Sequence, residues 1–175
     1  MNELAVRTAV YTGSFDPPTL GHLNVIERSS RLVDRLIVGV GINTGKIPLF
    51  SPEERAELVT LATSHLPNVE VRPFQGLAVD FVRSCGSCVM VRGVRPLTDI
   101  AAEFTMVMGN KELDPEIETI FLMADEQYTH VSSTLIKEIT PLSSDDRLAH
   151  FVPRVIIPAL RAKLPTQPRS SPDDS

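Results

Sequence analysis

Five short apolar runs recur along the chain, and each is separated from the next by a segment with the periodicity of an amphipathic helix. Each run is apolar through most of its length instead of alternating with polar residues, which is typical of strands buried on both faces of a parallel sheet. The predicted strands are Arg7–Thr12, Arg35–Ile42, Val69–Arg72, Val89–Val91 and Thr119–Met123.

The segments between these runs predict helices, and two of them carry start signals. Ser51 is a good N-cap, with Pro52 at the first helical position and Glu54 at the third. Thr98 followed by Asp99 is a second start, with an acid in the first turn. The predicted helices are Leu20–Val33, Pro52–Leu66, Leu77–Ser84 and Thr98–Leu113.

The last quarter of the chain predicts more helix and then a polar tail. Ser132-Ser133-Thr134 starts a short helix, and helical pattern continues to about Leu164. Residues 165–175 are rich in Pro, Ser and Asp, so we expect a disordered tail. We therefore predict a single domain over residues 1–164, which is long enough to bury one core.

The repeated alternation of strand and helix predicts the fold class. It favours right-handed crossovers and a Rossmann-like, doubly wound α/β fold with a five-stranded parallel sheet. Ligands of such sheets bind at the carboxyl ends of the strands. The loops that follow each predicted strand are therefore the places to look for function.

Composition and charge narrow the function classes. The chain has 175 residues, 42% of them hydrophobic, and a formal net charge of −5, which argues against a broad nucleic-acid-binding face. No apolar run is long enough to span a bilayer, and the N-terminal segment lacks the order of a signal peptide. We expect a cytoplasmic protein that binds neither nucleic acid nor membrane.

The two cysteines, Cys85 and Cys88, have Cys-x-x-Cys spacing. A redox pair or half of a zinc site is one interpretation, but no second Cys/His pair with ligand spacing follows. Cys88 also opens an apolar run, where a buried thiol behaves as a small hydrophobe. We favour the second interpretation and predict no bound metal.

The loop after the first strand predicts a phosphate site. Gly13 lets the backbone approach a ligand closely, and Ser14 offers a hydroxyl and an N–H. The helix that follows presents unpaired N–H groups to an anion, and His22 lies in its first turn. In the alternative interpretation, Gly13 and the prolines only punctuate a loop and His22 lies on a helix surface.

Three later loops place cations and hydroxyls at the same edge of the predicted sheet. Lys46 follows the second strand, and Arg92 and Arg95 bracket Gly93 at the end of the fourth, a pattern suited to phosphate. After the fifth strand, the hydroxyls of the Ser132-Ser133-Thr134 helix start would grip phosphates. Simple N-capping by Ser132 is the alternative.

These segments resemble known enzymes. Thr-x-Gly-His after Gly-Ser-Phe-Asp-Pro resembles the signature of the nucleotidylyltransferase superfamily, in the form of the phosphopantetheine adenylyltransferases. Arg-Gly-Val-Arg, Phe-Ser-x-x-Glu-Arg and Val-Ser-Ser-Thr-Leu-Ile-Lys-Glu resemble later segments of the same family, over about residues 7–164. Where the family reads Asp-Phe-x-Tyr-Glu, this chain has Ala at the aromatic position before Glu103 and Ile at the other.

The resemblance implies a reaction and its ligands. ATP and 4′-phosphopantetheine would give dephospho-coenzyme A and pyrophosphate, with Mg²⁺ accompanying the triphosphate. The family also implies a homohexamer and feedback inhibition by coenzyme A. Two alternatives are another nucleotidylyltransferase, with nicotinamide mononucleotide or glycerol phosphate as acceptor, and a non-catalytic binder of nucleotide or coenzyme A.

The resemblance also implies residue roles. The catalytic residues would be Ser14, His22, Lys46 and Arg92, with His22 and Ser14 stabilising the transition state. Phosphopantetheine would contact Ser14, Lys46, Ala78 and Arg92, with Leu77 adjacent. ATP would contact Ser14, Phe15, His22, Gly93, Val94, Arg95, Glu103, Tyr128, Thr129, His130, Val131, Ser132, Ser133 and Thr134.

Overall fold

The structure is a computed structural model that describes residues 6–42, 47–94 and 100–166. Two predicted site residues, Lys46 and Arg95, lie outside the described residues, as do the helix start at Thr98-Asp99 and most of the tail. The side chains of the Ile100–Ala102 stretch are also outside the description.

The centre of the fold is a five-stranded sheet in the order β3-β2-β1-β4-β5, and every neighbouring pair is parallel. The chain first moves outward from β1 through β2 to β3, then returns past β1 to add β4 and β5. This confirms the doubly wound α/β fold and puts its topological switch point between β1 and β4. The strands are β1 (Thr8–Gly13), β2 (Arg35–Gly41), β3 (Val69–Phe74), β4 (Val89–Val94) and β5 (Glu118–Met123).

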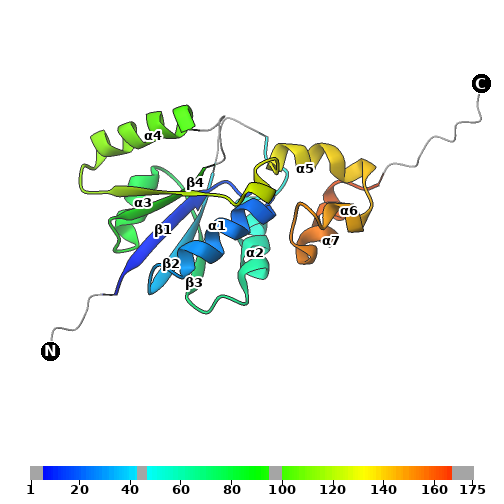
Figure 1. Ribbon diagram of the computed structural model, residues 1–175, viewed down its shortest axis with the longest axis horizontal. Helices are drawn as coiled ribbons and strands as arrows, with labels where there is room; N and C mark the ends of the chain where they lie inside the picture. Colours follow the sequence, from blue (N-terminus) through cyan, green and yellow to red (C-terminus); the bar gives the residue numbers. More distant parts are fainter. Residues whose placement is uncertain (1–5, 43–46, 95–99, 167–175) are drawn as a thin grey trace, which may run out of the picture.

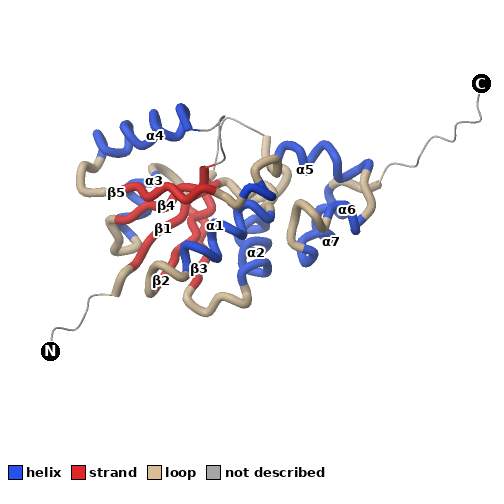
Figure 2. Tube along the Cα trace, viewed as in Figure 1, coloured by secondary structure: helices blue, strands red, loops and turns tan. Residues whose placement is uncertain are grey.

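Helices cover both faces of this sheet, as Figures 1 and 2 show. The helices are α1 (Leu20–Ser30), α2 (Pro52–Thr63), α3 (Ala78–Ser84) and α4 (Ile100–Leu113). Ser51 caps α2 as predicted, in a capping box with Glu54. α1 ends three residues earlier than predicted, because Ser29 and Ser30 turn their hydroxyls back onto the carbonyls of Val25 and Glu27.

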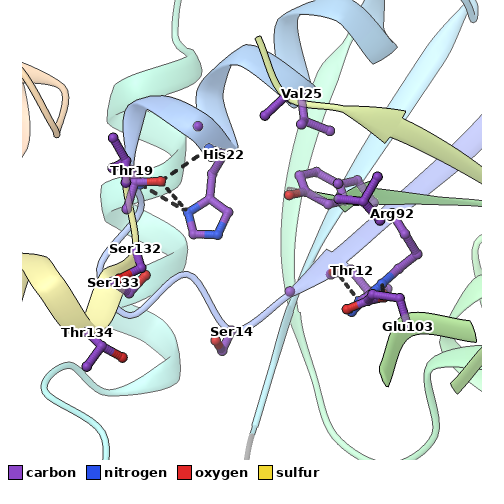
Figure 3. A pocket seen from close by; sticks show the side chains of 17 residues that line it. Thr12, Ser14, Thr19, His22, Val25, Arg92, Glu103, Ser132, Ser133 and Thr134 are labelled. Carbon is purple, nitrogen blue, oxygen red and sulfur yellow. Dashed lines mark hydrogen bonds and ion pairs between the residues drawn. The ribbon is translucent and has the colours of Figure 1, made fainter. Parts of the chain in front are cut away.

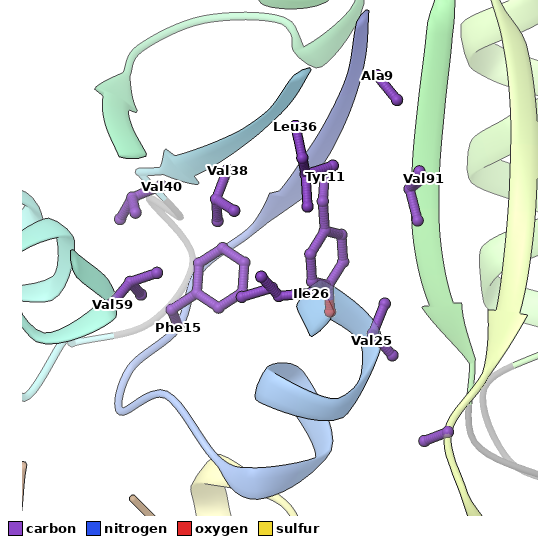
Figure 4. Close-up of a cluster of buried hydrophobic side chains, with 11 residues drawn as sticks. Ala9, Tyr11, Phe15, Val25, Ile26, Leu36, Val38, Val40, Val59 and Val91 are labelled. Atoms are coloured by element: carbon purple, nitrogen blue, oxygen red, sulfur yellow. The ribbon is translucent and has the colours of Figure 1, made fainter. Parts of the chain in front are cut away.

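Alternate residues of the strands enter two separate cores. On one face Tyr11 packs with Val25 and Ile26 of α1 and Val59 of α2 (Figure 4). On the other face Val10, Ile37 and Met90 pack against α3 through Val79 and Val82. Both cores consist almost wholly of apolar side chains, which agrees with the non-alternating strands seen in the sequence.

The last part of the chain forms short helical pieces beside the sheet, on the side where α2 begins (Figure 1). The predicted helical tail is broken because Pro141, Pro153 and Pro158 each stand at the start of a new piece. These pieces share a core with Phe50 and Leu58. They are η1 (Glu126–Tyr128), α5 (Ser133–Ile139), η2 (Thr140–Leu142), α6 (Asp145–Leu148), η3 (Arg154–Ile156) and α7 (Ile157–Lys163).

This C-terminal segment also fixes the start of α1. The backbone N–H of Leu20 donates to the carbonyl of Phe151 at 2.8 Å. A residue far along the chain thus satisfies one of the N–H groups that a helix start leaves without an internal partner. Of the helices in the described part of the chain, none is both long and apolar enough to cross a membrane.

Candidate active site

A cleft of about 300 Å³ opens at the carboxyl ends of β1 and β4, the two strands between which the direction of strand addition reverses. Four segments meet there, as Figure 3 shows: the β1–α1 loop, the first turn of α1, the end of β4 and the start of α5. The predicted site residues that line it are Ser14, His22, Arg92, Gly93, Val94, Glu103, Val131, Ser132, Ser133 and Thr134. The sequence therefore located most of the cleft.

His22 has its ring orientation fixed by the cap of its own helix. Thr19 is the N-cap of α1, and its hydroxyl accepts the His22 N–H at 3.3 Å. In return His22 Nδ1 accepts the backbone N–H of Thr19 at 3.1 Å. This is a capping box in which histidine takes the place of the usual glutamate, and it explains the Thr-x-Gly-His spacing.

The capping box also fixes the tautomer of His22. A backbone N–H can only donate, so Nδ1 must present its lone pair to Thr19, and the proton of the neutral ring lies on Nε2. In Figure 3 the ring projects from α1 toward the side of the pocket where Ser14 lies. The ring thus supplies a fixed N–H donor for an anion bound in the cleft.

The loop between β1 and α1 has an unusual backbone. Phe15 has φ of +47°, rare for a bulky residue, while its side chain is fully buried. The Phe15 ring stacks edge-on against Tyr11 and His22, with centroids 5.4 and 5.0 Å away. A Cβ on Gly13 would lie 2.9 Å from this ring. Phe15, predicted in the ATP site, can therefore reach a ligand only through its backbone.

Arg92 is held rigidly at the end of β4. Its Nε and Nη2 donate to the two carboxylate oxygens of Glu103, both at 2.8 Å, and its Nη1 donates to the carbonyl of Thr12 at 2.9 Å. Burial alone would lower the pKa of Arg92, but the hydrogen bond and charge of Glu103 outweigh it and leave that pKa raised. A cation fixed in this way at the cleft suits a phosphate.

The close packing at the end of β4 depends on Gly93. A Cβ there would lie 3.0 Å from both Tyr11 Oη and Val25 Cγ2. The glycine therefore lets the strand lie against the first strand and helix, and leaves its backbone at the cleft. Tyr11 and Thr12, which also line the cleft, were not singled out from the sequence because both fall inside an apolar strand.

The three hydroxyls at the start of α5 have different tasks. Ser132 is the N-cap and accepts the N–H of Leu135 at 3.1 Å. Ser133 Oγ donates to the carbonyl of Pro17 at 2.8 Å and joins this helix to the β1–α1 loop. Thr134 also lines the cleft. Capping and ligand contact are thus compatible at this helix start, since all three residues line the cleft.

Asp16 is a buried organiser that the sequence pattern did not single out. Its carboxylate accepts the N–H groups of Leu49 and Phe50 at 2.9 and 3.0 Å and pairs with Lys137 of α5 at 2.5 Å. One side chain thereby ties the β1–α1 loop to the approach of α2 and to α5. The one feature of the sequence that could have pointed to Asp16 is its position within the Gly-Ser-Phe-Asp-Pro motif.

Some predicted contact residues are not among those that line this cleft. Tyr128 lies beside Gly21, which does line it, Thr129 donates to the carbonyl of Glu126, and His130 packs edge-on against Phe151. Ala78 starts α3 and packs with the opposite core.

Neither cysteine lines the cleft, and both are free thiols. Cys85 is buried in the core on the α3 side, whereas Cys88 is exposed, so the prediction that Cys88 is a buried hydrophobe was wrong. Within residues 6–42, 47–94 and 100–166, no cluster of three or more His, Cys, Asp or Glu is placed to hold a metal ion.

Comparisons with known proteins agree with this architecture. Residues 10–139 match the cytidylyltransferase-like family model. A curated phosphopantetheine adenylyltransferase of Rhodopirellula baltica is 68% identical over 157 residues, covering 89% of this chain and 88% of that protein. One from a Synechococcus strain is 49% identical and covers 90% and 98%.

Solved structures share the fold at low sequence identity. A putative nicotinate-nucleotide adenylyltransferase from Vibrio parahaemolyticus superposes with a TM-score of 0.63 at 17% identity, covering 90% of this chain and 92% of that one. The Plasmodium falciparum nicotinic acid mononucleotide adenylyltransferase complexed with NaAD gives 0.58 at 12% identity, covering 90% and 95%. These neighbours share the Rossmann-like arrangement of a parallel sheet and its flanking helices.

Proposed function

The chain belongs to the phosphopantetheine adenylyltransferases of the cytidylyltransferase-like family, and we propose that its cleft at the ends of β1 and β4 is where ATP and 4′-phosphopantetheine react. The reaction of this enzyme class gives dephospho-coenzyme A and pyrophosphate. The observation that carries the assignment to this cleft is the pair of fixed donors, His22 Nε2 and Arg92, at the switch point of the sheet.

The two substrates divide the cleft between them. The triphosphate lies over the start of α1 and the hydroxyls of Ser132 to Thr134, where backbone N–H groups and the helix dipole favour negative charge. The phosphate of phosphopantetheine lies beside Arg92 and Ser14. Lys46 and Arg95, outside the described residues, are proposed as further cations for these phosphates.

The chemistry requires no protein nucleophile. An oxygen of the phosphopantetheine phosphate attacks the α-phosphorus of ATP in line, and the bond to pyrophosphate breaks. His22 Nε2–H donates to an oxygen of the α-phosphate as negative charge gathers there. The contribution of the protein is to hold both reactants in line and to neutralise their charge.

Mg²⁺ enters this scheme as part of the nucleotide substrate. Within the described residues, the carboxylates nearest the reacting groups already have partners, because Glu103 pairs with Arg92 and Asp16 pairs with Lys137. We therefore propose that the phosphate oxygens and water hold the ion, which is the common mode for Mg²⁺.

Assembly into a hexamer is a further part of the proposal. Apolar side chains that are between 45% and 67% exposed gather on α4 and β5, an arrangement that favours contact with another copy. They are Phe104, Met106, Met108, Ile120 and Met123. Sedimentation velocity at micromolar concentration should give the hexamer, and a monomer alone would contradict it. Inhibition by coenzyme A and a cytoplasmic location are proposed on the family's behaviour.

An acceptor screen tests the proposed function. Pyrophosphate release is measured with Mg²⁺–ATP and, in parallel, 4′-phosphopantetheine, nicotinamide mononucleotide or glycerol phosphate, with CTP as a second nucleotide. We expect release only with ATP and phosphopantetheine, and dephospho-coenzyme A by mass. Release with another acceptor would overturn the substrate, and silence with all three despite ATP binding would favour a non-catalytic binder.

A further inference from the structure

Arg55 of α2 is a buried cation that the reaction scheme does not use. Arg55 is only 2% exposed, and its side chain is among the largest fully buried ones in the described part of the protein. Within the described residues its hydrogen bonds go to backbone carbonyls: Nη1 donates to Ser14 at 2.7 Å and Gly41 at 2.9 Å, and Nε donates to Ser51 at 3.3 Å. No carboxylate of the described residues lies within 4 Å of it.

Stability alone is a weak reason for such a residue. A buried guanidinium loses its hydration, and carbonyl dipoles compensate that loss less well than a carboxylate would. An apolar side chain of similar volume would fill the same space in the core without that cost. The three carbonyls that it binds are therefore the informative feature, since they belong to three different segments.

Ser14 is the most informative of the three. A trans peptide is planar and directs its C=O and its N–H to opposite sides. Because the carbonyl of Ser14 is drawn toward Arg55 beneath the loop, the N–H of Phe15 in the same peptide faces away from Arg55. Within the described residues this N–H has no hydrogen-bond acceptor, although Ser14 lines the cleft.

The same peptide is constrained from its other end. Phe15 has φ of +47°, and its ring is fully buried against Tyr11 and His22. A bulky residue stays in this region only when its surroundings over-determine it. The core fixes the Phe15 side chain and Arg55 fixes the Ser14 carbonyl, so the direction of the intervening N–H is set from both sides.

Through the carbonyl of Gly41, Arg55 also holds a second loop. It is the last residue of β2, directly before the segment that carries Lys46. One planar guanidinium therefore sets the ends of β1 and β2 relative to each other at the edge of the sheet where ligands bind. Nη1 donates to both of these carbonyls while Nε donates to Ser51, and a lysine ammonium has no second nitrogen with which to hold the third carbonyl.

We propose that Arg55 is a positioning residue for adenylyl transfer, which turns the Phe15 N–H into a preset donor for a phosphate of the bound nucleotide and holds the β1 and β2 loops in register. The inference rests on the proposed function, because the anion that the N–H meets is a substrate phosphate. Arg55 donates to three backbone carbonyls, and it acts through the Ser14–Phe15 peptide. A preorganised backbone donor of this kind stabilises charge that develops in the transition state.

The kinetic test compares Arg55→Met with a matched variant, Arg161→Met. Arg161 also donates to two backbone carbonyls, those of Thr140 and Ser143, but in the C-terminal helices outside the cleft lining. We expect Arg55→Met to lower kcat per folded molecule about a hundredfold, with a much smaller change in the KM for ATP. Arg55→Lys should give an intermediate loss, and Arg161→Met should lose stability but keep the wild-type kcat.

The possible results distinguish the positioning role of Arg55 from the adenylyl transfer itself. A folded Arg55→Met enzyme with kcat within threefold of wild type would overturn the positioning role while the adenylyl transfer itself stands. Equal losses of kcat in the Arg55 and Arg161 variants would also overturn it, since they would show a structural effect only. A wild-type enzyme that fails to form dephospho-coenzyme A would instead overturn the proposed function.

A measurement on the wild-type protein decides the case if Arg55→Met does not fold. Ser14–Phe15 is the only Ser-Phe dipeptide in the chain, so labelling Ser with ¹³C at the carbonyl and Phe with ¹⁵N selects one peptide. Adding Mg²⁺–ATP without phosphopantetheine should move its amide proton downfield, as a new hydrogen bond to phosphate requires. An unchanged resonance at saturating ATP would overturn the proposal.

Discussion

Substitutions at His22 separate the two tasks that its ring performs. Nδ1 accepts the Thr19 N–H at 3.1 Å and caps α1, while Nε2–H is the proposed donor to the α-phosphate. Ala removes both functions. Glu, the usual residue at this position of a capping box, keeps the acceptor for Thr19 but offers no donor. Gln keeps the acceptor and can present an amide N–H near the place of Nε2.

The expected magnitudes differ between stability and rate. Losing a cap interaction costs about 1 kcal/mol, so His22→Ala should be less stable than wild type by that amount, whereas the Glu and Gln variants should be close to wild type. Losing one preset donor in the transition state costs about 10²–10³-fold in kcat. We therefore expect kcat to fall by that factor in both Ala and Glu, and by less in Gln.

Urea unfolding and initial-rate kinetics with ATP and phosphopantetheine provide the assay. The KM for ATP should change much less than kcat in His22→Ala, because the donor acts mainly in the transition state. If His22→Glu kept turnover within a few-fold of wild type while His22→Ala lost it, the ring would matter only as a helix cap. Wild-type turnover in His22→Ala would refute the catalytic role altogether.

Two other predictions concern charged groups. Arg92→Lys keeps the charge but not the fork that binds Glu103, so the KM for phosphopantetheine should rise about tenfold or more; an equal rise for ATP in the same kinetics would contradict the assignment. Glu70, half-buried on β3, has its pKa lowered from 4.5 to about 2 by hydrogen bonds from Arg72 and Arg35. The stability that ionised Glu70 adds to the fold is complete above pH 4.5 and is lost as the pH falls toward 2. Glu70→Gln should therefore lower the free energy of unfolding by about 0.5 kcal/mol at pH 7. In urea unfolding from pH 7 to pH 3 that deficit should shrink with falling pH, and a constant deficit would show that the two arginines do not cause it.

Much of the fold was predictable because it follows from local pattern. Apolar runs without alternation indicated buried parallel strands, and the order of strands and helices indicated the doubly wound sheet. Since the carboxyl ends of parallel strands meet at one edge, the loops with Ser14, Arg92 and Ser132 were expected to converge, and they line one cleft. The breaks at Pro141, Pro153 and Pro158 were also readable in principle.

The features that the sequence did not reveal depend on distant partners. The Asp16–Lys137 pair joins residues 121 positions apart, and Arg92 meets Glu103 only because α4 returns to the end of β4. The tautomer of His22 follows from a hydrogen bond that exists only once the cap has formed. Periodicity reports which face of an element is buried, but it does not say which side chain of another element will meet it there.

A crystal structure with dephospho-coenzyme A bound would show whether adenylyl transfer takes place in this cleft. We expect this product to lie in the cleft between β1 and β4, with its adenylyl phosphate about 3 Å from His22 Nε2 and its other phosphate on Arg92. The nucleotide should lie toward the start of α5. A product bound elsewhere, or in the cleft with its adenylyl phosphate beyond hydrogen-bond reach of His22, would contradict the proposed site and the role of His22.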